Sequence, residues 1–293
     1  MIVHQFWYNL TPSPSLRALN LYSIRSILKQ GHTLYLWAYQ PFDNLPSNNP
    51  RFQLQDCNQL LPFREFQGYL DNNIHIAHVS DLIRILALKQ YGGWWLDSDS
   101  LVLRPLPSSD AYYFATLPAK RVGGGFFHYE RKPARWAGSK HFVGLDGKDE
   151  FNNSPFFVKS ANDPWVAEIE AFIRKQFEKK KALPWRTVLN KMQASIVEHQ
   201  MHDYVHPAID FCPLPFWMRD NPFKDALNQP QTKFGAVIPS IDEILERSTV
   251  VQLFFMSSEK EKTAERDDAW LEKMLATYPD SALNRLFKRS FAP

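Results

Sequence analysis

One stretch, residues 77–106, joins a helix pattern to a strand pattern and restricts the folds open to this chain more than any other feature. Its first half places apolar side chains on one helix face, with Ser80 as the expected N-cap and the Gly92-Gly93 pair as the expected end. Residues 94–103 are then expected to form one buried strand that two aspartates interrupt. The apolar helix positions are Val79, Leu82, Ile83 and Leu86.

The two aspartates of this expected strand, Asp97 and Asp99, are two positions apart, so both side chains should leave the same side of the backbone. Two like charges that are buried together are unfavourable unless a cation or a set of hydrogen-bond donors offsets them. A divalent cation is the simplest solution, and oxygen ligands suit Mn²⁺ or Mg²⁺. The alternative is a strand end at which both carboxylates face solvent or cap a turn.

The preceding helix carries Asp81 and Arg84, which are i and i+3 neighbours away from the main apolar face. Taken alone, they would form a surface ion pair that contributes less than ~1 kcal/mol. The whole run, Ser-Asp-x-x-Arg, an apolar turn, Gly-Gly and aromatic-Leu-Asp-x-Asp, resembles the sugar transferases with a DXD-containing sugar-binding region, glycosyltransferase family 32-like. This group includes α-1,4-galactosyltransferases, yeast-type α-mannosyltransferases, bacterial capsule and lipopolysaccharide transferases, and the catalytic domains of clostridial glucosylating toxins. The resemblance is strong over residues 75–106.

The resemblance implies an α/β fold of the GT-A type, a Rossmann-like mixed sheet flanked by helices. It implies transfer of a hexose, with retention of configuration, from a nucleotide diphosphate sugar (expected to be a UDP-sugar) to a carbohydrate or glycolipid acceptor in bacterial surface polysaccharide synthesis. Asp99, with Asp97 directly or through water, would hold Mn²⁺ or Mg²⁺ against the departing diphosphate. Asp97 and Asp81 would bind ribose or sugar hydroxyls, and Arg84 would bind sugar or phosphate oxygens.

The N-terminal region predicts a strand at residues 2–8, a helix that begins near Leu16 and ends at Gly31, and a second strand at residues 32–39. Such a β-α-β start implies a parallel sheet, and ligands of parallel sheets gather at the carboxyl ends of the strands. Trp7 lies at such an end. The family resemblance places Trp7 against the nucleotide base with Gln5 nearby, and the alternative is a tryptophan of the core.

Two further positions follow from the resemblance. Asn153, which precedes a short apolar stretch, matches the asparagine that lies near the transferred sugar, and its alternative role is that of a turn residue beside Pro155. The family also places a histidine on a C-terminal strand close to the metal or the diphosphate. Gln252 occupies the expected position of this histidine, so the chain departs from the family pattern there.

The chain of 293 residues is expected to form a single domain, with a nucleotide-sugar half over residues 1–110 and an acceptor half over residues 111–293. Residues 41–74 are rich in Pro, Asn and Gln and are expected to be irregular apart from a short helix near residues 57–61. With 34 basic and 31 acidic residues, the charge balance argues against nucleic acid as a partner. Two isolated cysteines indicate buried thiols in a reducing compartment.

No apolar run approaches the ~20 residues of a membrane span, and no charged region precedes the first strand, so we expect a bacterial cytoplasmic protein. The C-terminal segment 280–291 has an apolar stripe opposite a basic face. The stripe is expected to dock on the protein's own core, and the sharper alternative is peripheral contact with the membrane through this helix. A second basic run, Lys179 to Lys181, complements a helix dipole and is expected to be solvated.

Three other classes remain open. A haloacid dehalogenase-type phosphatase also carries Asp-x-Asp after an apolar strand, but it would have this motif in its first strand, and Ser100 and Leu101 fit its pattern poorly. A transferase-derived protein that binds nucleotide sugar or carbohydrate without catalysis is compatible with Gln252. An effector that glycosylates host proteins is the third alternative. An EF-hand is excluded, because Leu101 stands where its loop needs a ligand.

Overall fold

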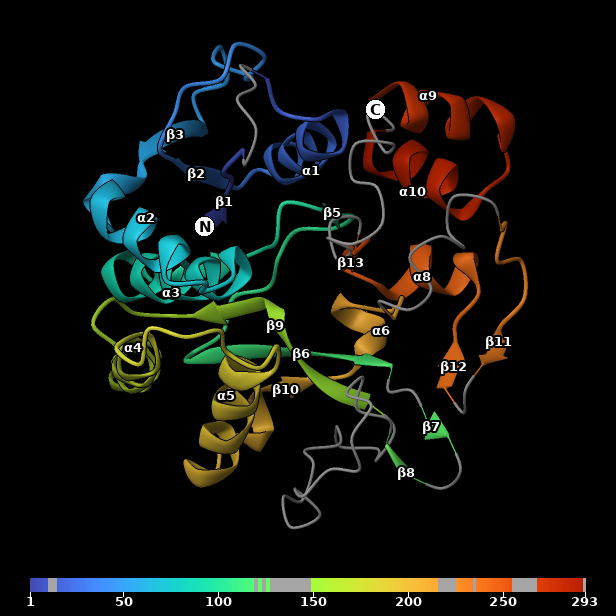
Figure 1. Cartoon of the computed structure of the whole chain (residues 1–293). Helices are drawn as coiled ribbons and strands as arrows, with labels where there is room; N and C mark the ends of the chain where they lie inside the picture. The colour runs from blue at the N-terminus through green and yellow to red at the C-terminus, as the bar shows by residue number, and fades with distance from the viewer. Residues whose placement is uncertain are drawn as a thin grey trace.

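A computed structural model describes residues 1–9, 15–118, 121–122, 125–126, 149–215, 225–233, 236–254 and 268–291. Its centre is a seven-stranded sheet in the order β10-β6-β9-β4-β1-β2-β3 (Figure 1). The strands β4, β1, β2 and β3 are parallel to one another, whereas β9 runs antiparallel to both of its neighbours. The mixed α/β sheet expected from the sequence is thus confirmed. Its strands are β1 (Ile2–Phe6), β2 (Thr33–Ala38), β3 (Phe52–Asp56), β4 (Gly93–Trp95), β6 (Tyr112–Pro118), β9 (Asp149–Val158) and β10 (Val205–His206).

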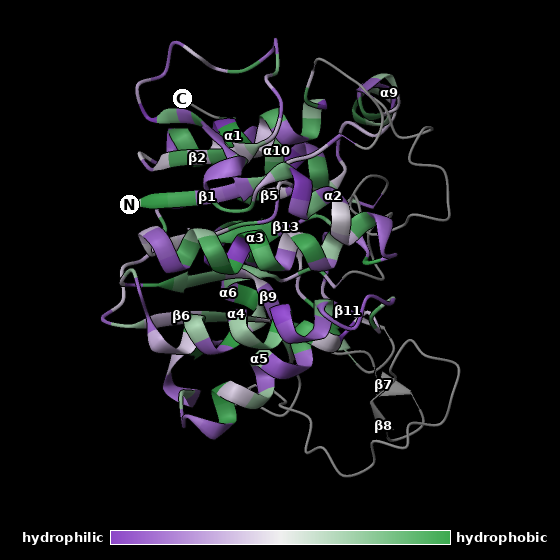
Figure 2. Cartoon of the chain, turned by 60° about the vertical axis from the view of Figure 1, so that its left-hand side comes forward, coloured by the Kyte–Doolittle hydropathy of each residue, from purple (hydrophilic) through white to green (hydrophobic). Residues whose placement is uncertain are grey.

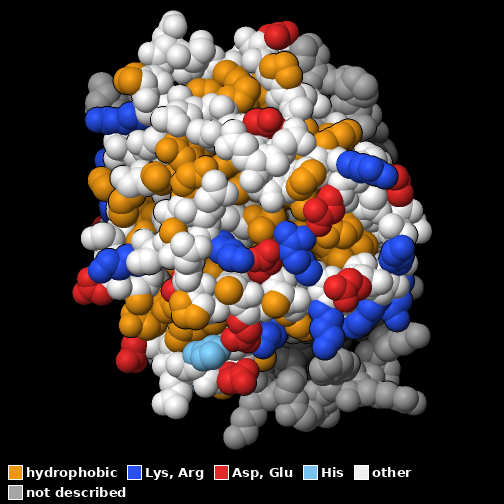
Figure 3. Space-filling model, turned by 90° about the vertical axis from the view of Figure 1, so that its left-hand side faces the viewer, with side chains coloured by type: hydrophobic (Ala, Val, Ile, Leu, Met, Phe, Trp, Pro, Cys, Tyr) orange, Lys and Arg blue, Asp and Glu red, His pale blue; other side chains and the backbone are white. Residues whose placement is uncertain are grey.

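Helices cover both faces of the sheet (Figures 1 and 2). The side with α2, α3, α4 and α5 is the face shown in Figure 3, where apolar side chains are mixed with charged ones. Successive strand residues point to opposite faces, so Trp95 packs into the core under these helices and Trp94 into the core on the α1 side. The helices are α1 (Ala18–Lys29), α2 (Phe63–Asp71), α3 (Ile76–Tyr91), α4 (Pro164–Phe177), α5 (Thr187–Glu198), α6 (Ala208–Phe211), α8 (Ile241–Arg247), α9 (Asp268–Thr277) and α10 (Ala282–Phe291), with short 3₁₀ turns at Cys57–Gln59 and His202–Tyr204.

Three two-stranded sheets complete the described structure. β5 (Ser100–Val102) pairs antiparallel with β13 (Val250–Gln252), and this pair carries the segment after the two aspartates away from the central sheet. β11 (Gln231–Lys233) pairs with β12 (Ala236–Ile238), and β7 (Arg121–Val122) pairs with β8 (Gly125–Phe126).

The helix α3 begins and ends through local features of the sequence. Its N-cap is His75, whose Nδ1 accepts a hydrogen bond from the Ala77 N–H, so the expected cap Ser80 lies inside the helix instead. Gly92 and Gly93 end the helix with φ angles of 65° and 94°. A Cβ on Gly92 would lie 2.8 Å from the Lys159 carbonyl oxygen, so no larger residue fits where helix and sheet meet.

The predicted β-α-β start is confirmed, since β1 and β2 are parallel neighbours joined through α1. The expectation of irregular structure over residues 41–74 is wrong, because this segment contains β3 and α2. Both elements lack a clear apolar pattern for a physical reason. β3 is an edge strand with mostly exposed side chains, and α2 buries only Phe66. Cys57 and Cys212 are buried free thiols, as expected.

The C-terminal helix α10 packs its apolar stripe onto the protein. Leu283, Leu286 and Phe287 are buried, and the ring of Phe287 lies 4.4 Å from the Tyr22 ring on α1. Lys288 and Arg289 are exposed on the opposite side. The stripe is therefore occupied by the protein's own core and is not a surface that a membrane would contact. Within the described segments, no helix has the length and apolar character needed to span a bilayer.

Candidate active site

The two aspartates lie in a turn between two short strands, and the expectation of one continuous strand over residues 94–103 is wrong. β4 ends at Trp95, and the Ser100 N–H donates to the Asp97 carbonyl oxygen at 3.0 Å, which closes the turn before β5 begins. β4 belongs to the central sheet and β5 pairs with β13, so the chain must leave one sheet for the other here. The two-residue period of a strand therefore does not fix the directions of Asp97 and Asp99.

The carboxylate of Asp97 is held by three side-chain donors. Its Oδ1 accepts from Arg84 Nη2 and from Trp95 Nε1, each at 3.0 Å, and its Oδ2 accepts from Gln252 Nε2 at 2.9 Å. The Asp97 N–H donates to Ser154 Oγ at 2.9 Å. Hydrogen-bond donors, the alternative to a cation, thus offset the negative charge of Asp97, and 31% of its side chain remains open to solvent.

Arg84 is the centre of this arrangement. The residue is 5% exposed, and its guanidinium forms ion pairs with Asp97 at 3.0 Å and with Asp81 at 3.4 Å. It also donates to the Asn153 carbonyl oxygen at 2.5 Å and lies 5.2 Å from the centre of the Trp95 ring. The interpretation of Asp81 and Arg84 as a surface ion pair is wrong, because both are buried. A charge placed so deep requires the partners it has here.

Asn153 lies within β9, where it is part of the strand and not of a turn. Its side-chain Nδ2 donates to Asp81 Oδ1 at 3.0 Å. The structure therefore brings Asp81, Arg84, Asp97 and Asn153 into one hydrogen-bonded group, although they come from α3, the acidic turn and β9. We call this group the acidic cluster.

Gln252, which stands where a histidine is expected, touches the cluster directly. Its Nε2 donates to Asp97, and its Oε1 accepts from Asn152 Nδ2 at 3.0 Å. The hydrogen bond from Asn152 fixes the orientation of the Gln252 amide, so that a donor faces the carboxylate. Sequence reasoning did not identify Asn152, Ser154 or Trp95 as contacts of the site. The sequence signal available for Asn152 and Ser154 was a polar residue within a mostly apolar run.

The helix α1 holds the acidic turn through a buried polar stripe at helical spacing. Asn20 Nδ2 donates to the Ser98 carbonyl oxygen at 3.1 Å, and Ser26 Oγ accepts from the Val102 N–H at 3.0 Å. Between them, Ser23 Oγ accepts from Gln5 Nε2 at 2.8 Å, and the same Gln5 nitrogen lies 3.3 Å from the Asp97 carbonyl oxygen. These contacts provide hydrogen-bond partners for backbone groups in the turn and in β5, which follows it.

Gln5 and Trp7 lie at the carboxyl end of β1, as expected. Gln5 is completely buried under the turn, and its side-chain amide donates to the Asp97 carbonyl oxygen. Trp7 is 8% exposed, belongs to the core cluster on the α1 side, and donates from Nε1 to Asn9 Oδ1 at 2.7 Å. Most of the ring is therefore in contact with the core.

Asp99 is 6% exposed, and its carbonyl oxygen accepts from the Leu253 N–H at 3.1 Å. Among the residues that the structure describes, no group of three or more His, Cys, Asp and Glu side chains could hold a metal ion. Two carboxylates in one turn nevertheless fit Mg²⁺ or Mn²⁺, because such ions often take one or two protein carboxylates and complete their shell with water and substrate phosphate.

The histidine next to Gln5 has a structural role. Burial lowers the pKa of His4 to about 4, although Nε2 lies 2.8 Å from the Gly92 carbonyl oxygen. Trp37 Nε1 donates to His4 Nδ1 at 3.1 Å, so the neutral ring with a proton on Nε2 satisfies both partners. His4 thus ties β1 and β2 to the end of α3.

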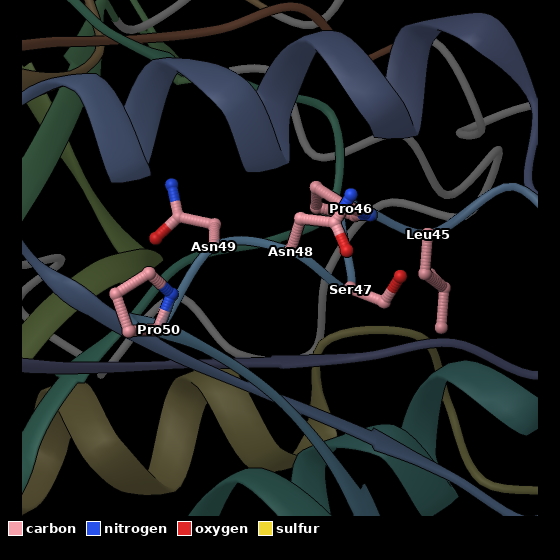
Figure 4. Close-up of a pocket in the computed structure, with 6 residues that line it drawn as sticks. All are labelled: Leu45, Pro46, Ser47, Asn48, Asn49 and Pro50. Carbon is pink, nitrogen blue, oxygen red and sulfur yellow. The ribbon is translucent and has the colours of Figure 1, made fainter.

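A surface hollow of about 420 Å³ lies on the loop after β2, lined by residues from Leu45 to Pro50 (Figure 4). None of the expected site residues lines it. It has no charged side chain, whereas the acidic cluster carries three.

A buried arginine and two carboxylates therefore lie together at the carboxyl edge of the α/β sheet. The expectation of a transferase enzyme is confirmed by the comparison with protein families. The model of the capsular polysaccharide synthesis protein family matches residues 61–208, about half of the chain, which include α3 and the whole acidic cluster but not Gln252. The chain belongs to this family.

Comparison with curated proteins gave no significant match. Among solved structures, the chain is similar to PaToxG glycosyltransferase, at 16% identity and a TM-score of 0.41, over 68% of this chain and 69% of that one. It is similar to a mutant form of a transferase, at 13% identity and a TM-score of 0.38, over 69% and 85%. A glycosyltransferase involved in glycosylation of the major capsid of PBCV-1 gives 12% identity and a TM-score of 0.34, over 92% and 98%.

Proposed function

We propose that the chain is a metal-dependent retaining glycosyltransferase of the GT-A, DXD-motif type. It moves a hexose from a nucleotide diphosphate sugar, a UDP-sugar in our proposal, to a carbohydrate acceptor in bacterial surface polysaccharide synthesis. The observation that carries this proposal is the acidic cluster, in which the buried Arg84 lies between Asp81 and Asp97 beside the turn that contains Asp99.

In this proposal Asp99, with Asp97, holds Mn²⁺ or Mg²⁺, which supplies Lewis-acid stabilisation of the leaving diphosphate when it is bound. Arg84 binds sugar or phosphate oxygens while it stays paired with both aspartates. Asp81 and Asn153 accept and donate hydrogen bonds at the transferred sugar. Trp7, at the end of β1, lies against the nucleotide base, with Gln5 under the turn.

The bond changes balance without a covalent enzyme intermediate. The bond between the anomeric carbon and the diphosphate oxygen breaks, the acceptor hydroxyl oxygen bonds to that carbon on the same face, and the hydroxyl proton leaves with the diphosphate. Water must be kept out, because the activated donor would otherwise be hydrolysed. The described residues offer no carboxylate that we assign as a nucleophile.

We further propose that residues 1–110 form the donor half and residues 111–293 the acceptor half of one domain. The enzyme would work in the cytoplasm, where nucleotide sugars are at hand and where the thiols of Cys57 and Cys212 stay reduced.

A thermal-shift screen of nucleotide sugars with Mn²⁺ tests the proposal. A ligand that binds only the folded state raises stability by about 2.7 kcal/mol at a hundredfold excess over its Kd, so one donor should stand out and lose its effect with EDTA. The stabilising donor should then be hydrolysed slowly without an acceptor. Stabilisation without hydrolysis would identify a binding protein in place of an enzyme, and no stabilisation by any nucleotide sugar would overturn the proposal.

A further inference from the structure

The loop between α4 and α5, residues 178–186, reaches the same edge of the protein as the acidic cluster. Trp185 in this loop lies 5.4 Å, between ring centres, from His75 and 6.1 Å from His78. His75 caps α3, and His78 Nδ1 lies 3.6 Å from Asp81 Oδ2. One histidine ring therefore separates Trp185 from the acidic cluster.

Trp185 is exposed to an extent that is unusual for its type. Its exposed fraction is 59%, while the tryptophans of β2 and β4 are at most 1% exposed. The two histidine rings support the indole from one side without covering it. An exposed, supported indole offers an apolar ring face on which the C–H groups of a sugar ring can stack.

The loop is also strongly basic. Lys179, Lys180 and Lys181 are all exposed, and Glu178 is the only acidic residue of the loop. The acidic residues of the adjoining helix are already paired. Glu168 pairs with Lys191 and His199, and Glu170 with Lys89 and Arg174. Lys179 Nζ donates to the neutral amide oxygen of Gln176 at 2.5 Å, and among the described residues no carboxylate forms an ion pair with Lys179, Lys180 or Lys181. Figure 3 shows basic side chains gathered towards one margin of this face.

We propose that residues 178–186 form the acceptor subsite and that it takes an anionic glycan. Trp185 stacks on a sugar ring, and Lys179 to Lys181 pair with carboxylate or phosphate groups further along the glycan. This inference rests on the proposed function, since it supplies the acceptor for the donor held at the acidic cluster. It replaces the expectation that the three lysines are merely solvated.

The test measures binding of the complete protein to an array of neutral, carboxylated and phosphorylated glycans. Trp185→Ala and the triple variant Lys179→Ser/Lys180→Ser/Lys181→Ser are compared with wild type. The matched controls are Val237→Ala on β12 and the double variant Lys288→Ser/Arg289→Ser on α10, which change exposed side chains elsewhere. Vesicles that contain phosphatidylglycerol form a separate arm.

We expect the wild-type protein to bind anionic glycans on the array. Trp185→Ala should weaken this binding about tenfold, which is the contribution of one aromatic contact. The triple lysine variant should abolish the preference for charged glycans and the salt dependence of binding. Both variants should hydrolyse the donor at the wild-type rate, which separates this inference from the proposed function. The inference is overturned if no glycan is retained, if neutral glycans bind equally well, if the controls weaken binding as much, or if only the vesicles bind.

Discussion

The α3–β4 segment and the strand β13 approach the carboxylate of Asp97 from two distant parts of the chain. The α3–β4 segment contributes Arg84 and the Trp95 indole, both within 13 positions of Asp97. β13 contributes Gln252, which is 155 positions away. One side thus supplies a charged partner from the local sequence, and the other supplies a neutral amide through tertiary structure.

The difference between the two regions teaches how the site divides its tasks. Arg84 supplies the positive charge that pairs with the carboxylates of Asp81 and Asp97 in a buried place. The amides of Gln252 and Asn152 set the direction of the carboxylate, because the hydrogen bond between them leaves one orientation of Gln252 favourable. Substitutions of Arg84 and Gln252 test this division directly.

The largest effect is expected from removal of the charge. Arg84→Ala leaves the carboxylates of Asp81 and Asp97 without their buried partner and should lower the free energy of unfolding by about 3–5 kcal/mol. Arg84→Lys keeps the charge but loses the planar fork, so it should be more stable than Arg84→Ala and still lose donor binding. Urea denaturation and calorimetry measure the two effects. Arg174→Ala, which removes a half-exposed ion pair with Glu65 and Glu170, should cost less than ~1 kcal/mol.

A negative charge introduced on β13, at Gln252, should destabilise the protein by repelling the carboxylate of Asp97. Gln252→Glu keeps the shape of the side chain but sets a second carboxylate against Asp97, and we expect a loss of about 2–3 kcal/mol with weaker donor binding. Gln252→His retains a ring N–H donor and should lose less. Gln53→Glu on the exposed edge strand β3 is the control. Wild-type stability of Gln252→Glu would show that β13 does not orient Asp97.

Acid should weaken the contact that His4 on β1 makes with Gly92 at the end of α3. Burial lowers the pKa of His4 from 6.5 to about 4, so the folded state resists protonation. The resulting contribution to stability is complete above pH 6.5 and is lost as the pH falls towards 4, by about 2 kcal/mol at pH 5. Wild type and His4→Gln are compared by urea denaturation at pH 7.5 and pH 5. The wild type should lose about 2 kcal/mol more than the variant, and equal losses would contradict the account.

The smallest effect concerns the helix that supports the turn. Asn20→Ala removes the hydrogen bond to the Ser98 carbonyl oxygen and should cost about 1 kcal/mol. It should also weaken metal-dependent donor binding, because the turn that carries Asp97 and Asp99 loses one of its backbone anchors. Arg25→Ala changes an exposed side chain of the same helix and should alter neither property. A variant that is destabilised but binds the donor normally would limit α1 to a structural role.

The local half of this site could be predicted from residue patterns alone, whereas Asn153 and Gln252, in the distant half, were expected near it only through the family resemblance. Helical spacing and the Gly92-Gly93 pair encode α3 and its end within the segment itself. The turn between Asp97 and Asp99 depends on β4 and β5, two three-residue strands with partners far away in the chain: β4 pairs with β1 and β9, and β5 pairs with β13. The contact of Gln252 with Asp97 likewise arises only when β13 pairs with β5.

The most direct test of the central claim is calorimetry of the stabilising nucleotide sugar with and without Mn²⁺, on wild type and on Asp99→Asn. The substitution keeps the size of the side chain and removes a charge beside Asp97. The account predicts that Asp99→Asn loses the Mn²⁺-dependent part of the affinity, by tenfold or more, which is about 1.4 kcal/mol. The metal-free variant should be as stable as wild type or slightly more stable, since repulsion is relieved. A clearly destabilised variant that still binds the donor with Mn²⁺ would contradict the account.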